Sequence, residues 1–266
     1  MSRIDRRFAQ LKSTQRKALI PFVTAGDPSL EATVPVMHAL VAAGADVIEL
    51  GVPFSDPMAD GPVIQRSSEQ ALRRGAGLRY VLQAVSEFRQ RDADTPVVLM
   101  GYLNPVEIHG NQRFAEEAVQ AGVDGILLVD LPPEEAAETR EIFTRQGLDL
   151  IALASPTTTP ERMAMLCGSA QGYLYYVSFA GVTGAGHLDT KAAGLRLHEL
   201  RAQARVPVVA GFGIKDAASA AAMAVEADGV VVGSALVACL AGAATPEEAA
   251  SRAAAFLAPL RQALDG

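Results

Sequence analysis

The sequence lacks several features that would place it outside the cytoplasm. It has two cysteines, Cys167 and Cys239, which are far apart and in no spacing typical of metal ligands. We expect both to be reduced, as is usual in the cytosol. No apolar run approaches the roughly 20 residues needed to cross a bilayer, and the N-terminal MSRIDRRF lacks the apolar stretch of a secretory signal. The sequence therefore predicts a cytoplasmic protein with no membrane partner.

Positive charge is also scarce. The chain has 23 Lys and Arg against 30 Asp and Glu, so its net charge is −7 at neutral pH. Its densest basic group is Arg3, Arg6 and Arg7, which we interpret as the solvated face of a first helix. A nucleic-acid surface needs clustered cations on a basic domain. The composition therefore predicts no nucleic-acid partner.

A repeating pattern organises the chain, and no linker-like tract interrupts it. Eight short runs rich in Val, Ile and Leu recur, at 18–23, 47–50, 96–100, 125–129, 148–153, 172–177, 206–210 and 229–232. Near-continuous apolar runs are typical of parallel strands buried on both faces. Helical stretches separate the runs, at 30–43, 63–74, 78–91, 111–121, 133–146, 160–166, 190–204, 216–225 and 246–263. We expect one domain over residues 1–266.

This rhythm predicts an α/β fold of the TIM-barrel type. Eight strand–helix repeats in roughly 250 residues are typical of a (β/α)8 barrel. The amphipathic start, with Ile4, Phe8 and Leu11, predicts an additional N-terminal helix. An open doubly wound sheet is the alternative, but no G-x-G-x-x-G follows the first run.

Several catalytic signatures are missing as well. There are four lysines, none in a predicted strand, which disfavours a Schiff-base aldolase. The four histidines form no H-x-H or E-x-x-H pattern, so a metal site is not predicted. No G-x-S-x-G elbow is present for acyl transfer. Acid–base chemistry by carboxylates on a phosphorylated substrate is the class that remains.

One stretch, DVIELGVPFSDPMADGP at 46–62, carries the candidate carboxylates. Glu49 interrupts the second apolar run, and a buried acid is costly unless it has a use. The following loop carries Asp56 and Asp60. Because barrel active sites lie at the C-terminal ends of the strands, Glu49 and Asp60 form a candidate acid–base pair.

Three glycine-bearing turns predict a phosphate site. They follow the last three runs, at 181–184 (GVTG), 211–213 (GFG) and 233–234 (GS). Glycines let backbone N–H groups converge on an anion, and barrels often bind phosphate after strands 7 and 8. Ordinary turns, which also need glycine, are the alternative.

The motifs together resemble a known family. IELGVPFSDPMADG at 48–61 closely resembles the signature of tryptophan synthase alpha subunits, and PFVTAGDP, SFAGVTG, GFGI and VVGSA follow the same family order. Val63 and Met100 depart from residues frequent in that family, threonine and leucine. Neither departure removes a charged group.

The resemblance implies cofactor-free cleavage of indole-3-glycerol phosphate to indole and glyceraldehyde 3-phosphate. Glu49 would protonate indole C3 and take the glycerol hydroxyl proton, Asp60 would bind the indole N–H, and Tyr175 would orient Glu49 and the glycerol part. The implied indole pocket consists of Phe22, Met100, Leu127, Thr183 and Phe212. The implied phosphate site consists of Gly184, Gly213, Gly233 and Ser234.

The resemblance also implies a partner, a beta subunit that carries pyridoxal phosphate, in an alpha2-beta2 heterotetramer. The candidate contact residues are Pro53, Asp56, Asn104 and Pro132. The loop after the second strand and the segment 181–187 would act as lids. The alternatives are a stand-alone lyase, a weakly catalytic activator of its partner, and another phosphate-binding barrel such as a sugar-phosphate isomerase.

Overall fold

Parallel strands form the centre of the structure, a computed structural model that describes residues 1–177, 190–211 and 213–266. Nine strands occur in these ranges: β1 Ala18–Thr24, β2 Ile48–Gly51, β3 Val97–Gly101, β4 Gly125–Leu128, β5 Asp149–Leu150, β6 Ala152–Ala154, β7 Leu174–Val177, β8 Val208–Gly211 and β9 Gly229–Val232. Their order in the sheet is β5-β4-β3-β2-β1-β9-β8-β7-β6, and every pairing is parallel.

The two edge strands, β5 and β6, are halves of one predicted strand. Only Ile151 separates them, so the chain itself bridges the two edges of the sheet. β5 pairs with β4, and β6 pairs with β7. The predicted run 148–153 therefore changes its hydrogen-bonding partner midway. The predicted (β/α)8 barrel is confirmed, with its fifth strand split and the barrel nearly closed.

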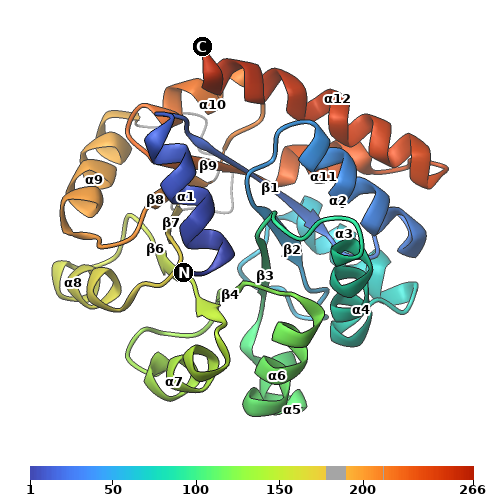
Figure 1. Cartoon of the computed structure of the whole chain (residues 1–266), viewed down its shortest axis with the longest axis horizontal. Helices are drawn as coiled ribbons and strands as arrows, with labels where there is room; N and C mark the ends of the chain where they lie inside the picture. The colour runs from blue at the N-terminus through green and yellow to red at the C-terminus, as the bar shows by residue number, and fades with distance from the viewer. Residues whose placement is uncertain (178–189, 212) are drawn as a thin grey trace.

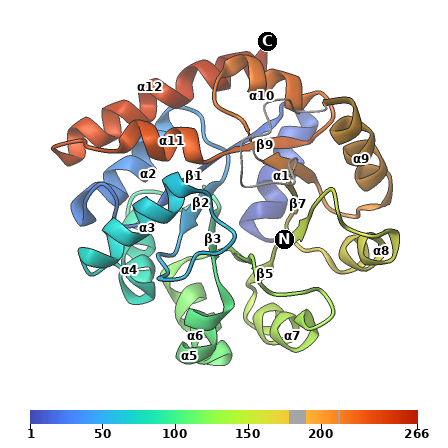
Figure 2. The same cartoon turned by 180° about the vertical axis from the view of Figure 1, so that it is seen from behind.

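Helices surround the barrel (Figure 1, Figure 2). The elements are α1 Arg3–Ser13, η1 Leu30–Ala32, α2 Thr33–Ala42, α3 Pro62–Arg73, α4 Leu78–Arg89, α5 Leu103–His109, α6 Asn111–Ala121, α7 Ala136–Gln146, α8 Pro160–Ser169, α9 Thr190–Gln203, α10 Ala217–Ala224, α11 Ser234–Leu240 and α12 Pro246–Asp265. None in the described ranges has the length and apolar character to cross a membrane.

Two short helices, α5 and α11, were absent from the sequence prediction. Each directly follows a strand end, where Asn104-Pro105 and Gly233-Ser234 indicate turns when read locally. Their buried residues, Val106 in α5 and Leu236, Val237 and Leu240 in α11, pack on the barrel. Tertiary packing, rather than local propensity, therefore stabilises these helices.

The N-terminal helix α1 closes one end of the barrel (Figure 1). Its buried residues Ile4, Phe8 and Leu11 belong to the same apolar cluster as inward-facing strand residues such as Val98 and Val209. The expected additional helix is confirmed. Its basic face is not simply solvated, because Arg3 donates to Asp124 at 2.9 Å.

Aspartates tie neighbouring strands together at the α1 end of the barrel. Asp46, Asp124 and Asp228 stand just before β2, β4 and β9, and their carboxylates accept the backbone N–H groups of Leu19, Val97 and Val208. Arg261, Arg89 and Arg201 donate to these same carboxylates. This end of the barrel is therefore held by ion pairs, and the opposite end carries the candidate site.

Candidate active site

Glu49 lies inside the barrel on β2. The register places it beside Phe22 of β1 and Val98 of β3. Its side chain is 0% exposed. Val47, two residues earlier, belongs to the barrel-interior cluster, and the period of two along a strand places Glu49 on the same inner face. The sequence prediction that Glu49 is buried is confirmed.

The carboxyl of Glu49 has one hydrogen-bond partner among the described residues. The hydroxyl of Tyr173 donates to Oε1 at 2.6 Å, while Oε2 is buried without a partner in those residues. Burial raises the pKa of Glu49 to about 7, and the Tyr173 hydrogen bond opposes that rise. A carboxyl with this pKa can both donate and accept a proton near neutral pH.

Replacing Tyr173 with phenylalanine is expected to shift the pH dependence of proton transfer by Glu49. Because the hydroxyl stabilises the ionised form of Glu49, its loss should raise the Glu49 pKa further and move the alkaline limb of kcat to higher pH. Steady-state rates between pH 5 and about 9.5 would measure this shift. Tyr176→Phe is the control, since Tyr176 belongs to the cluster outside the barrel. An unmoved alkaline limb in Tyr173→Phe would contradict the assignment.

Glu49 is also expected to lower the stability of the protein as the pH rises. Its pKa is 4.5 when unfolded and about 7 when folded, so between these values only the unfolded state releases the proton and folding becomes less favourable. In Glu49→Gln this loss is absent. The difference in unfolding free energy between the variant and wild type should therefore grow in favour of the variant, by up to about 3 kcal/mol, as the pH rises from 4.5 to 7.5.

Urea unfolding of the two proteins at both pH values would measure this gain. Comparing Glu49→Gln with wild type cancels the contributions of other groups whose pKa is raised, such as Asp149. A difference that stays constant with pH would show that the Glu49 pKa is close to its unfolded value.

Asp60 lies in the loop after β2 and is held by Tyr102, which follows β3. The Tyr102 hydroxyl donates to Asp60 Oδ2 at 3.0 Å and accepts the backbone N–H of Ala59 at 3.0 Å. The ring of Tyr102 stacks on Phe54 with centroids 5.0 Å apart. Burial raises the pKa of Asp60, and the Tyr102 hydrogen bond opposes this. This role of Tyr102 was not predicted from the sequence.

A narrow recess of about 20 Å³ brings several predicted residues together. Asp60, Phe22 and Met100 line it, together with Thr24 and Tyr102. Thr24 Oγ1 is buried with no partner in the described residues, as is Glu49 Oε2. Buried polar atoms without partners are rare and mark positions where a ligand can supply the hydrogen bond.

Two further residues of the predicted site, Leu127 and Tyr175, lie in the barrel interior. Leu127 pairs in register with Met100 and is fully buried. Tyr175 is 7% exposed, and burial followed by the charges of Glu49 and Asp60 raises its pKa well above the usual value. Gly211 makes room for this ring, since a Cβ there would stand 2.0 Å from the Tyr175 hydroxyl.

Tyr173 is a further tyrosine at this site. Tyr175 was expected to orient Glu49 and the glycerol part, and among the described residues the hydrogen bond to Glu49 comes from Tyr173. Both tyrosines project to the same side because they are two residues apart in an extended segment. That spacing was visible in the sequence and would have identified Tyr173 as a second inward-facing tyrosine.

The described part of the predicted phosphate site follows two adjacent strands, β8 and β9. Gly213 has a φ of +77°, which favours glycine, and Gly233-Ser234 starts α11 without a side-chain cap. The starts of α10 and α12, by contrast, are capped by Asp216 and Thr245. Gly184, Thr183 and Phe212 lie outside the described residues.

The predicted partner residues differ in exposure. Asp56 and Asn104 are exposed and Pro132 is half-buried, all in loops or helix starts that follow strands β2, β3 and β4. Pro53 is buried, so a partner could contact it only after the loop rearranges. Within the described ranges, no group of three or more His, Cys, Asp or Glu is placed to hold a metal.

The fold and this site define a (β/α)8-barrel protein with carboxyl groups at the C-terminal ends of its strands. Comparison with known proteins narrows the class. The family described as tryptophan synthase alpha chain matches residues 8–265, so the chain belongs to that family.

Individual relatives agree with this membership. The chain is 77% identical to the tryptophan synthase alpha chain of Xanthomonas euvesicatoria pv. vesicatoria and 78% identical to that of Xanthomonas oryzae pv. oryzae, each over 100% of this chain and 99% of the relative. The solved alpha subunit from Legionella pneumophila has a TM-score of 0.92 at 46% identity, covering 100% and 99% of the two chains. A tryptophan synthase structure from M. tuberculosis has a TM-score of 0.87 at 36% identity, covering 99% and 100%. The family inferred from the sequence motifs is confirmed.

Proposed function

We propose that the chain cleaves indole-3-glycerol phosphate to indole and D-glyceraldehyde 3-phosphate, a retro-aldol reaction catalysed by Glu49 and Asp60. The observation that carries this proposal is the fully buried carboxyl of Glu49, whose pKa of about 7 suits reversible proton transfer. Family membership supports the same reaction.

Glu49 acts on both sides of the bond that breaks. Its protonated carboxyl gives a proton to indole C3, and the ring nitrogen takes up the resulting positive charge. The carboxylate then removes the proton of the glycerol hydroxyl. The oxygen electrons form the aldehyde C=O, the C–C bond breaks, and its electron pair returns to the ring and restores indole. Atoms and charges balance without a cofactor.

Asp60 stabilises the charged intermediate. Its carboxylate accepts the indole N–H, and the interaction strengthens as positive charge develops on the ring. The recess that Asp60 lines with Phe22 and Met100 is apolar enough to hold the indole rings. At about 20 Å³ it must widen to admit them, so the loop that carries Asp60 opens and closes during the cycle.

The phosphate is held by the glycine turns after β8 and β9. The uncapped start of α11 leaves backbone N–H groups that can donate to the phosphate oxygens. Gly213, Gly233 and Ser234 supply the described part of this site, and Gly184 completes it in the proposal.

The partner is a beta subunit that uses the indole. The M. tuberculosis structures similar to this chain are of tryptophan synthase. Exposed Asp56 and Asn104, with Pro132, lie at the same end of the barrel as Asp60 and can form the contact surface. We place the protein in the cytoplasm, which agrees with its free cysteines Cys167 and Cys239.

An indole-release assay tests the function. The chain is incubated with indole-3-glycerol phosphate, with and without a beta subunit, and indole and glyceraldehyde 3-phosphate are quantified. Equimolar products, with a rate that rises when the beta subunit is added, are expected. An unchanged rate would favour a stand-alone lyase, and no indole in either case would favour another phosphate-binding barrel.

A further inference from the structure

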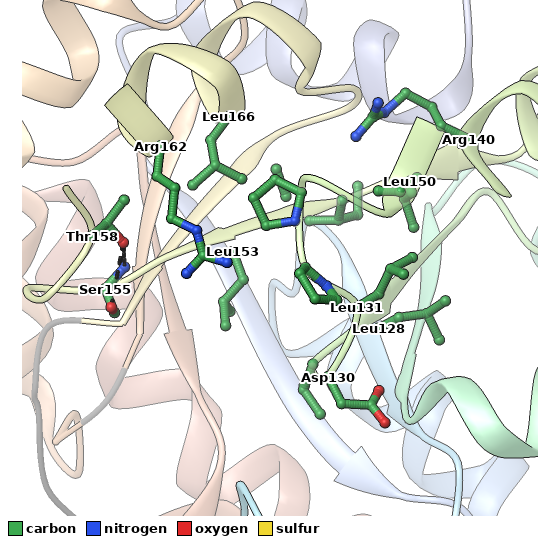
Figure 3. Close-up of a pocket in the computed structure, with 16 residues that line it drawn as sticks. Leu128, Asp130, Leu131, Arg140, Leu150, Leu153, Ser155, Thr158, Arg162 and Leu166 are labelled. Carbon is green, nitrogen blue, oxygen red and sulfur yellow. Dashed lines mark hydrogen bonds between the residues drawn. The ribbon is translucent and has the colours of Figure 1, made fainter. Parts of the chain in front are cut away.

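A second cavity lies outside the catalytic site, between α7 and α8 (Figure 3). Its volume is about 300 Å³, which lies at the lower end of the range for small-molecule sites. Most of the residues that line it are apolar, and they come mainly from the ends of β4 and β6 and from the two helices. The leucines of this wall are Leu128, Leu131, Leu150, Leu153 and Leu166.

Arg140 of α7 is the unusual member of this wall. Figure 3 shows its side chain and that of Arg162 reaching towards the cavity from α7 and α8. In the described residues the guanidinium of Arg140 has no hydrogen-bond or ion-pair partner, and its Nε is buried. Burial lowers its pKa, and two acids of this region are engaged elsewhere, since Glu134 pairs with Arg162 and Asp130 accepts the backbone N–H of Leu103.

The other arginines at buried positions behave differently. Arg89 donates to Asp124 at 2.8 Å, and Arg261 donates to Asp46 at 2.9 Å. Arg162, on the same cavity, is held by both carboxylate oxygens of Glu134 at 2.6 and 2.8 Å. Arginine stays protonated in proteins, and a charge that is partly removed from water is costly unless it is paired. Arg140 therefore lacks the counter-ion that its neighbours have.

We propose that this cavity binds a small apolar monocarboxylate, branched or aromatic, whose carboxylate pairs with Arg140 while its apolar body contacts the leucine wall. One unpaired cation matches one negative charge. A phosphate dianion fits poorly, because Arg162 is already neutralised by Glu134 and only the charge of Arg140 is left unpaired in the lining. Asp130, which would repel any anion, lies on the opposite side of the cavity from Arg140 (Figure 3). None of the lining residues belongs to the glycine turns proposed for substrate phosphate, while Val129 also lines the recess at Asp60 and Pro132 is one of the candidate partner contacts.

Methyl-detected NMR titration of the full chain with 4-methylpentanoate tests the proposal. The neutral isostere 4-methylpentanamide has the same shape without the charge. We expect saturable shifts at Leu150, Leu153 and Leu166, with the acid binding about tenfold or more tightly than the amide, as expected for hydrogen bonds to a charged group. Equal binding of acid and amide, or shifts centred on Leu127 in the barrel interior, would overturn the proposal.

Two variants localise the effect. Arg140→Gln should weaken the acid about tenfold and leave the amide unchanged, while Arg140→Lys should retain part of the preference because it keeps the charge. Arg145→Gln is the matched control, since Arg145 lies on the same helix with a side chain 70% exposed and pairs with Glu141.

Acid binding that survives in Arg140→Gln would contradict the proposal. Should Arg140→Gln fail to fold, the acid–amide comparison on the unmodified chain decides by itself. Because the readout is binding, it does not depend on the lyase assay.

Discussion

Glu49→Gln is expected to abolish indole release while substrate binding is nearly unchanged. The amide keeps the shape of the carboxyl but cannot protonate C3 or remove the hydroxyl proton, and positioned acid–base catalysis is worth about 10²–10⁴-fold. Single-turnover rates and substrate titration of the inactive variant would separate the two effects. Tyr173 can still donate to the amide oxygen, so the local structure should persist.

The control for this experiment is Glu107→Gln. Glu107 lies on α5, after the neighbouring strand β3, and its side chain is exposed. It should retain full activity. If Glu49→Gln kept more than a tenth of the wild-type kcat, another group would have to transfer the proton, and the role proposed for Glu49 would be wrong.

Asp60→Asn is expected to lower kcat by about 10²–10³-fold, the size of effect seen when one group that stabilises developing charge is removed. The amide is neutral, so it cannot balance the positive charge on the indole ring. Tyr102 can still donate to the amide oxygen, which should keep the loop in place. The measurement is kcat and KM for indole release by the chain without a partner.

Asp56→Asn is the matched control for Asp60. Asp56 belongs to the same loop but is exposed, and it accepts a hydrogen bond from Ser55 rather than from Tyr102. Its loss should leave the rate of the isolated chain unchanged. If Asp60→Asn altered KM alone, Asp60 would be a binding residue without a role in the chemical step.

The barrel could be predicted because its signal is repeated along the chain. Eight apolar runs separated by helical stretches leave few alternatives, and all eight appear as strands. The errors occurred where local signals were weak. The helices α5 and α11 start at Asn-Pro and Gly-Ser turns, and the fifth run splits because its two halves pair with different neighbours.

The catalytic candidates were recognisable for a different reason. Glu49 is conspicuous because a charged residue inside an apolar run conflicts with burial, and such conflicts mark functional sites. Asp60 follows it in the same motif. Their partners gave a weaker signal, because Tyr102 and Tyr173 are far from Asp60 and Glu49 along the chain. The two-residue spacing from Tyr175 indicates that Tyr173 faces inward, but it does not indicate which carboxyl Tyr173 contacts.

The sequence by itself therefore determined the barrel, the family, and the positions of Glu49 and Asp60. Only the tertiary structure decided that Tyr173, 124 residues from Glu49, holds its carboxyl, and that Tyr102, 42 residues from Asp60, holds the loop. The same is true of Arg140, whose missing counter-ion becomes apparent only when α7 and α8 enclose a cavity. The physical reason is that periodicity and burial are encoded locally, whereas a hydrogen bond or ion pair across the barrel depends on closure that brings distant segments together.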